Sequence, residues 1–78
     1  TAQVAYARIL ETLGEGREAL RWLEAAIDLG LPRDHELDAR RRSAQHLATL
    51  GRLAEARVHL VKALELSPDD ATARAMLA

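Results

Sequence analysis

The sequence predicts an all-α protein of about five helices, and three observations carry this prediction. Ala, Leu, Arg and Glu dominate the composition, and all four residue types favour helices. Phe is absent and Val and Ile are few, so extended strands are not expected. Aromatic residues make up only 3% of a chain that is 49% hydrophobic. We therefore expect a core built by close helix packing rather than by large rings.

The chain contains an internal repeat with a period of 37 residues. Within residues 1–30, 11 positions are identical to the residue 37 positions later. Chance would give about 3 identities in a chain so rich in Ala and Leu, so the repeat is real. The clearest correspondence joins Thr12-Leu13-Gly14 to Thr49-Leu50-Gly51.

Each repeat unit is predicted to be a pair of helices. The first helix covers residues 2–13 and again 34–50, and the second covers residues 17–29 and again 53–66. Gly14 and Gly51 are expected to end the first helices, because glycine adopts the left-handed conformation of a helix C-terminus. The apolar stripe of the second helices is predicted to comprise Ala19, Leu23, Ala26, Ile27, Ala56, Leu60, Ala63 and Leu64.

A fifth helix is expected over residues 69–77. Ser67 suits its N-cap and Pro68 its first position, and Asp69 with Asp70 would lie at the positive end of the helix dipole. For the two aspartates we favour this capping role over a role in acid–base chemistry. At the corresponding place in the first unit, Asp34 is the preferred cap.

Residues 50–70 resemble the second half of a tetratricopeptide repeat, a helix–turn–helix unit of about 34 residues. The small residues Ala7 and Ala44, the turn glycines and the paired alanines of the second helices match the family pattern. Pro68 closes the repeat as the pattern requires, and Pro32 comes one residue late. Gly16 departs from the pattern, since a bulky residue usually packs there, so a weak first turn is expected.

The resemblance implies one domain in which helix pairs stack as a right-handed superhelical solenoid. Its repeats would cover about residues 1–33 and 34–68, with a partial third repeat or capping helix at 69–78. The longer period predicts either an early start of the helix at residue 34 or a bulge over residues 31–35. The family binds peptides in the groove of its first helices, which here implies the candidate site residues Arg8, Arg41, Arg42, Gln45 and Met76.

The run Arg40-Arg41-Arg42 has two interpretations. Arginine is suited to bidentate contact with a carboxylate, so Arg41 and Arg42 could bind an acidic peptide or a free C-terminal carboxylate. The bland alternative, which we favour, is a solvated helix face on which the arginines pair with Glu36 and Asp38.

Trp22 also has two interpretations, a residue packed at the edge of the core or an exposed anchor for another chain. His46 and His59 could approach each other across the second helix pair, but two ligands make a weak metal site. We therefore predict surface histidines and no metal. No nucleophile lies in a catalytic constellation, so neither an enzyme nor a cofactor is expected.

Formal net charge is −1, which is not the basic balance expected of a nucleic-acid partner. No apolar run is long enough to insert into a membrane. There is no cysteine, and the compartment is undetermined, with the cytoplasm as the default. The excess of Arg over Lys is typical of a GC-rich bacterial gene.

The function that follows is a protein–protein interaction scaffold. Two alternatives stay open, an architectural or regulatory segment of a larger enzyme, secretion or signalling protein, and a module that self-associates through its repeat ends. The chain begins at Thr1 without an initiator Met, which predicts a fragment of a longer protein. About three repeats are normally needed to bury a continuous core, so uncovered repeat ends are expected here.

Overall fold

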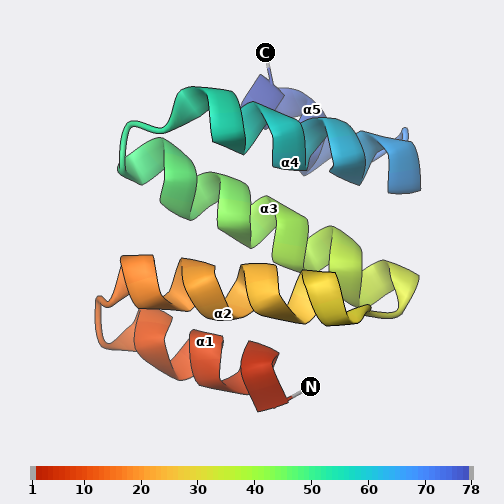
Figure 1. Cartoon of the computed structure of the whole chain (residues 1–78). Helices are drawn as coiled ribbons and strands as arrows, with labels where there is room; N and C mark the ends of the chain where they lie inside the picture. Colours follow the sequence, from red (N-terminus) through yellow and green to blue (C-terminus); the bar gives the residue numbers. More distant parts are fainter. Residues whose placement is uncertain (1, 78) are drawn as a thin grey trace.

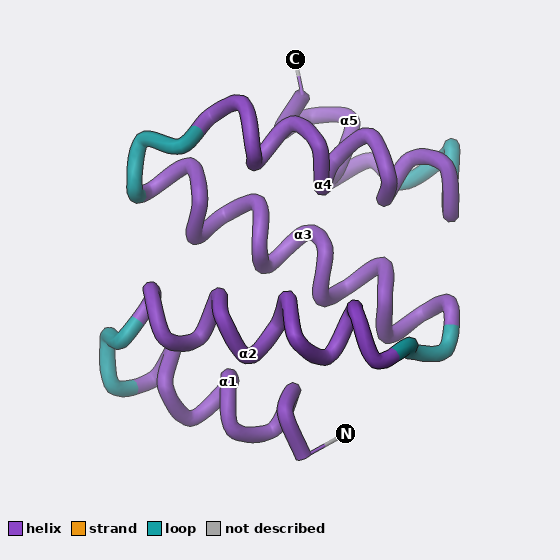
Figure 2. The backbone as a smooth tube through the Cα atoms, viewed as in Figure 1, coloured by secondary structure: helices purple, strands orange, loops and turns teal. Residues whose placement is uncertain are grey.

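The protein is described by a computed structural model that covers residues 2–77 and consists of helices joined by short turns (Figure 1). The helices are α1 (Ala2–Thr12), α2 (Gly16–Leu29), α3 (Arg33–Thr49), α4 (Leu53–Leu66) and α5 (Ala71–Leu77). Within these residues there is no strand (Figure 2), which confirms the all-α prediction. The predicted domain limits at residues 1 and 78 lie outside the described residues.

The helices form two layers. Figure 1 shows α2 and α4 in one layer and α1, α3 and α5 in the other, with each helix packed against the helices before and after it in the chain. The first helices of the two repeats and the fifth helix therefore lie in one layer. Side chains from α1, α3 and α5 can meet there although they are far apart in the sequence.

The core follows the predicted stripes and is made largely of alanine and leucine. Ala19 and Ala63 have no exposed surface, which lets the neighbouring helices approach closely, as predicted. One cluster joins α1 and α2 to α3 through Ala7, Leu10, Ala19, Leu23 and Ala39. The other joins α2, α3, α4 and α5 through Leu20, Ala44, Leu47, Ala56, Leu60, Ala63 and Ala73. Ala73 lies in this cluster with Met76 and Leu77 beside it, so α5 covers part of the apolar surface of α4.

The two turn glycines act as predicted. Gly14 and Gly51 have φ values of +80° and +78°, which side chains other than glycine rarely adopt. In the second turn the Arg52 N–H donates to the Leu47 carbonyl at 2.8 Å and the Gly51 N–H to the Ala48 carbonyl at 3.0 Å. The first turn repeats this pair of bonds, which is the Schellman arrangement that satisfies the last carbonyls of a helix.

The longer repeat period is explained by an early start of α3. This helix begins at Arg33, one residue before its predicted start, and runs for 17 residues. Pro32 occupies the N-cap position, and no side chain of the described residues makes a cap hydrogen bond there. The prediction that Asp34 is the cap is therefore wrong, because Asp34 already lies in the first turn, where its charge favours the positive end of the dipole.

The predicted start of the fifth helix is also wrong. Ser67 is the C-cap of α4, where its N–H donates to the Ala63 carbonyl at 2.9 Å. The cap of α5 is Asp70, whose carboxylate accepts the Ala73 N–H at 2.8 Å. Pro68 consequently lies in the turn rather than in the helix. Ser and Asp are about equally good caps, so the sequence alone did not discriminate between them.

Candidate functional site

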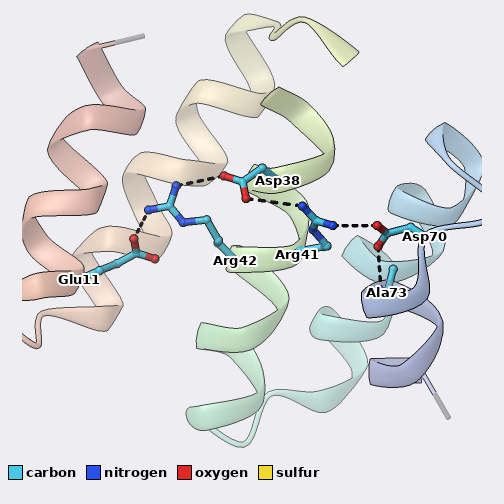
Figure 3. A network of polar contacts seen from close by, with 6 residues as sticks. All are labelled: Glu11, Asp38, Arg41, Arg42, Asp70 and Ala73. Atoms are coloured by element: carbon cyan, nitrogen blue, oxygen red, sulfur yellow. Dashed lines mark hydrogen bonds and ion pairs between the residues drawn. The ribbon is translucent and has the colours of Figure 1, made fainter. Parts of the chain in front are cut away.

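The arginine run of α3 lies at the centre of an ion-pair network that crosses the layer of α1, α3 and α5 (Figure 3). Arg42 donates to the Glu11 carboxylate of α1 and, at 3.3 Å, to Asp38 on its own helix. Asp38 also lies 3.7 Å from Arg41, which donates at 2.7 Å to Asp70. We call these five residues the α1–α3–α5 network. It joins both repeats and the start of α5 through charged side chains.

Asp70 has a double role in this network. One carboxylate oxygen accepts from Arg41, and the other caps α5 through the Ala73 N–H (Figure 3). A charge-assisted hydrogen bond is stronger than a neutral one, and both of these bonds use the ionised carboxylate. The position of α5 is therefore coupled to an arginine of the central helix.

Glu11 receives two donors from α3. Its second carboxylate oxygen lies 2.6 Å from His46 Nε2, beside the oxygen that accepts from Arg42. Burial raises the pKa of Glu11, but the hydrogen bonds from Arg42 and His46 lower it more, so that the pKa lies below its usual value. Glu11 is thus held ionised between the two repeats.

A second histidine makes the same kind of contact in the other layer. His59 Nε2 of α4 lies 3.0 Å from a carboxylate oxygen of Glu24 on α2. The other ring nitrogen lies 3.2 Å from Arg40, which itself pairs with Glu36. The two histidines therefore bind separate glutamates and do not pair with each other. Among the described residues no group of three or more potential ligands could hold a metal ion.

The candidate binding residues differ in how they are engaged. Arg41 and Arg42 are partly buried and bonded within the network, and the predicted pairing with Asp38 is present. Arg8 and Gln45 are exposed, and neither side chain has a partner within residues 2–77. These two stand at equivalent positions, since 37 residues separate them. We call the surface of Arg8, Thr12, Gln45 and Thr49, all exposed, the Arg8–Gln45 face.

Met76 and Trp22 lie elsewhere. Met76 lines a hollow of about 260 Å³ between α3, α4 and α5 that also touches Ala48 and Leu53. Trp22 remains 39% exposed and makes an edge contact with Tyr6, with ring centres 5.0 Å apart. Both aromatic rings line a hollow of about 410 Å³ on the outer surface of α1 and α2. The predicted site residues thus lie on three separate surfaces.

A family model described as "Tetratricopeptide repeat" matches residues 37–78, which is more than half of the chain. The chain belongs to the tetratricopeptide repeat family. Membership confirms the family that the sequence resembles, and this family typically provides surfaces for protein–protein interaction. No curated protein and no solved structure is significantly similar to the chain.

The tetratricopeptide repeat match begins inside α3 and leaves the first repeat out. Gly16 is one departure of the first repeat from the family pattern, because it stands where that pattern has a bulky residue. A Cβ atom added to Gly16 would meet His46 Nδ1 at 3.3 Å, so the histidine of the second repeat fills this space. α2 nevertheless begins at Gly16, one residue earlier than predicted.

Sequence reasoning missed Glu11, Glu24 and Asp70 as partners of the α3 and α4 side chains. Each histidine follows its glutamate by 35 residues, close to the repeat period, and this spacing was the available signal.

The helices of the described residues are all too short or too polar to span a membrane.

Proposed function

We propose that this tetratricopeptide repeat protein is a non-catalytic module that binds a peptide segment of another protein on the Arg8–Gln45 face. The observation that carries the proposal is the pair Arg8 and Gln45. They stand at equivalent positions of the two repeats, both are exposed, and neither side chain has a partner within residues 2–77. Equivalent positions in stacked repeats point to the same side, so one extended segment can contact both.

The chemistry of these two side chains favours a partner that carries a carboxylate. Arg8 supplies a guanidinium whose donors are not used within the described residues, and Gln45 supplies both a donor and an acceptor. Arg41, at the edge of the network, keeps part of its surface exposed and would add to the positive potential. Met76 is left out of this proposal, because it lines the separate hollow between α3, α4 and α5.

The network gives Arg41 and Arg42 a second role, which is to hold the binding face in shape. Arg42 fixes α3 against α1, and Arg41 fixes α3 against the cap of α5. A rigid face loses less conformational entropy when a peptide binds. We therefore assign direct recognition mainly to Arg8 and Gln45, and positioning together with part of the charge to the two paired arginines.

The test is fluorescence anisotropy with a labelled acidic peptide that ends in a free carboxylate. Arg8→Ala and the double variant Arg41→Ala with Arg42→Ala should each weaken binding about tenfold. Lys62→Ala is the matched control, because Lys62 is exposed on α4 in the other layer. Its substitution removes one positive charge, as Arg8→Ala does. Binding should also weaken with salt.

Unchanged affinity in both arginine variants would contradict the proposal. An equal loss in Lys62→Ala would contradict it as well, since that result indicates nonspecific charge attraction. The amidated form of the same peptide separates recognition of the terminal carboxylate from recognition of acidic side chains.

A further inference from the structure

Large apolar side chains are exposed at both ends of the helix stack. At the end formed by α1 and α2 they are Tyr6, Ile9, Leu13 and Trp22, and on α4 at the other end they include Leu53 and Val61. Ile9 is 57% exposed, Leu53 66% and Val61 45%. Exposed apolar patches of this kind mark interaction sites in soluble proteins.

The contact between the two repeats inside the chain is a template for what these ends can bind. There α3 and α4 sit on α1 and α2 through three polar pairs, Arg42 with Glu11, His46 with Glu11 and His59 with Glu24. His46 also packs against Gly16. Ala39 of α3 completes the contact within the buried cluster of α1 and α2.

Moving the template by one repeat period of 37 residues replaces every charged pair by an apolar pair. On the incoming side, His46 corresponds to Ile9 and His59 to Trp22. On the receiving side, Glu11 corresponds to Ala48 and Glu24 to Val61.

The same shift of 37 residues relates two further positions. Arg42 corresponds to Ala5, and Gly16 corresponds to Leu53. The side-chain volumes on the receiving surface change in opposite directions. Ala48 is smaller than Glu11, to which it corresponds, and Leu53 is larger than Gly16. The two ends of the described helix stack are thus complementary to each other in polarity and in size.

We propose that the protein self-associates head to tail, with α1 and α2 of one copy docking on α3 and α4 of the next. Ile9 would contact Ala48 and Leu53, and Trp22 would contact Val61. This contact uses the ends of the stack, so it does not rest on peptide binding at the Arg8–Gln45 face.

The receiving surface has room for an incoming helix. Between α3, α4 and α5 lies the hollow of about 260 Å³ lined by Ala48, Leu53 and Met76. The same shift places Ala2 of the incoming copy at the position of Met76, so an incoming α1 begins where α5 ends. Only the last turn of α5 must yield to it.

Such a contact is heterologous, because the two copies use different surfaces. Each copy keeps one free head and one free tail, so association continues as an open chain instead of stopping at a dimer. Sedimentation velocity should therefore show a series of species whose mean size increases with protein concentration. The single tryptophan lies in the contact, so its emission should shift to shorter wavelength over the same concentration range.

Two variants test the two contact surfaces separately. Ile9→Glu places a charge on the head, which is the surface of α1 and α2, and Val61→Glu places a charge on the tail, which is the surface of α3 and α4. Each variant alone should raise the dissociation constant at least about tenfold. Mixing them should restore association, because the intact head of one variant fits the intact tail of the other. That mixture should stop at a one-to-one complex. Leu29→Glu, which alters an exposed leucine that the template does not use, is the control and should associate like the parent.

Arg57 provides a variant that should strengthen the contact. It corresponds to Leu20, which is buried in the cluster with Ala44 and Leu47, so Arg57 is the position where the receiving surface is more polar than its template. Arg57→Leu should lower the dissociation constant about tenfold.

A single monomeric species up to about 1 mM, with an unchanged tryptophan emission, would overturn the proposal. A mixture of Ile9→Glu and Val61→Glu that stays monomeric while the parent associates would also overturn it. That second result would assign the association to a symmetric contact of two like surfaces.

Discussion

His46 Nε2 lies 2.6 Å from a carboxylate oxygen of Glu11, and this contact ties the second repeat to the first. The same carboxyl group accepts from Arg42 through its other oxygen. The glutamate is therefore shared by two side chains of α3, one turn apart. Loss of its charge should affect the packing of the repeats as well as the pairs themselves.

Glu11→Gln should lower the free energy of unfolding by about 1–2 kcal/mol at pH 7, because a charge-assisted bond to Arg42 is lost. The lowered pKa of Glu11 also fixes the pH dependence. A depressed pKa stabilises the fold above the unfolded value of 4.5, and this stabilisation is lost as the pH falls through the folded pKa. Urea denaturation of both proteins between pH 7 and pH 3.5 should thus show a difference that shrinks with acid.

The control for this experiment is Glu65→Gln, at an exposed glutamate of α4 with no partner in the described part of the chain. It should change stability by less than about 0.5 kcal/mol at any pH. A Glu11→Gln effect that is constant across the pH range would contradict the assignment of the effect to the ionised carboxylate.

Asp70→Ala should destabilise α5 by about 1–2 kcal/mol, because it removes both the cap bond to Ala73 and the pair with Arg41. Asp70→Asn keeps a good cap and loses the charge, so its cost should be smaller. Ser67→Ala should be nearly neutral, since the Ser67 side chain caps no helix. Thermal unfolding followed by circular dichroism measures all three, and a larger loss from Ser67→Ala than from Asp70→Ala would refute the cap assignment.

Gly51→Ala should cost about 1–2 kcal/mol, because its φ of +78° forces the new Cβ toward a carbonyl oxygen. In a domain of this size that corresponds to a fall in Tm of roughly 4–16 °C. Gly51→Asn should cost less, since asparagine tolerates the left-handed conformation. Differential scanning calorimetry checks the order, and equal costs for the two variants would show that the backbone conformation is not the cause.

Ser43→Ala should raise stability by about 0.5–1 kcal/mol. Ser43 is fully buried in α3, and its hydroxyl has no hydrogen-bond partner among the described residues. Removing an unsatisfied polar group eliminates a desolvation cost, and alanine is also the better helix former. Chemical denaturation measures the change, and a loss of stability would show that the hydroxyl is bonded in solution.

The sequence by itself determined the helices and the repeat. Alanine and leucine at intervals of three and four dictate amphipathic helices, and Gly14 and Gly51 dictate where the first helices end, because both effects are local. It also determined the buried stripes of α2 and α4, since one apolar face on each helix leaves one way to pack. Helix limits were predicted to within one or two residues, apart from the alternative caps at Ser67 and Asp70.

Only the tertiary structure decided what the charged side chains do. The sequence favoured a solvated face for Arg41 and Arg42 and left an anion site open. It did not predict their partners Glu11 and Asp70, which lie about 30 positions away in the sequence. The stacking of the repeats brings these carboxylates to the arginines. Arg8 and Gln45 are the polar candidate residues whose side chains have no partner among residues 2–77. Pairing over such a distance in the sequence depends on how the helices pack, and no local sequence pattern determines that packing.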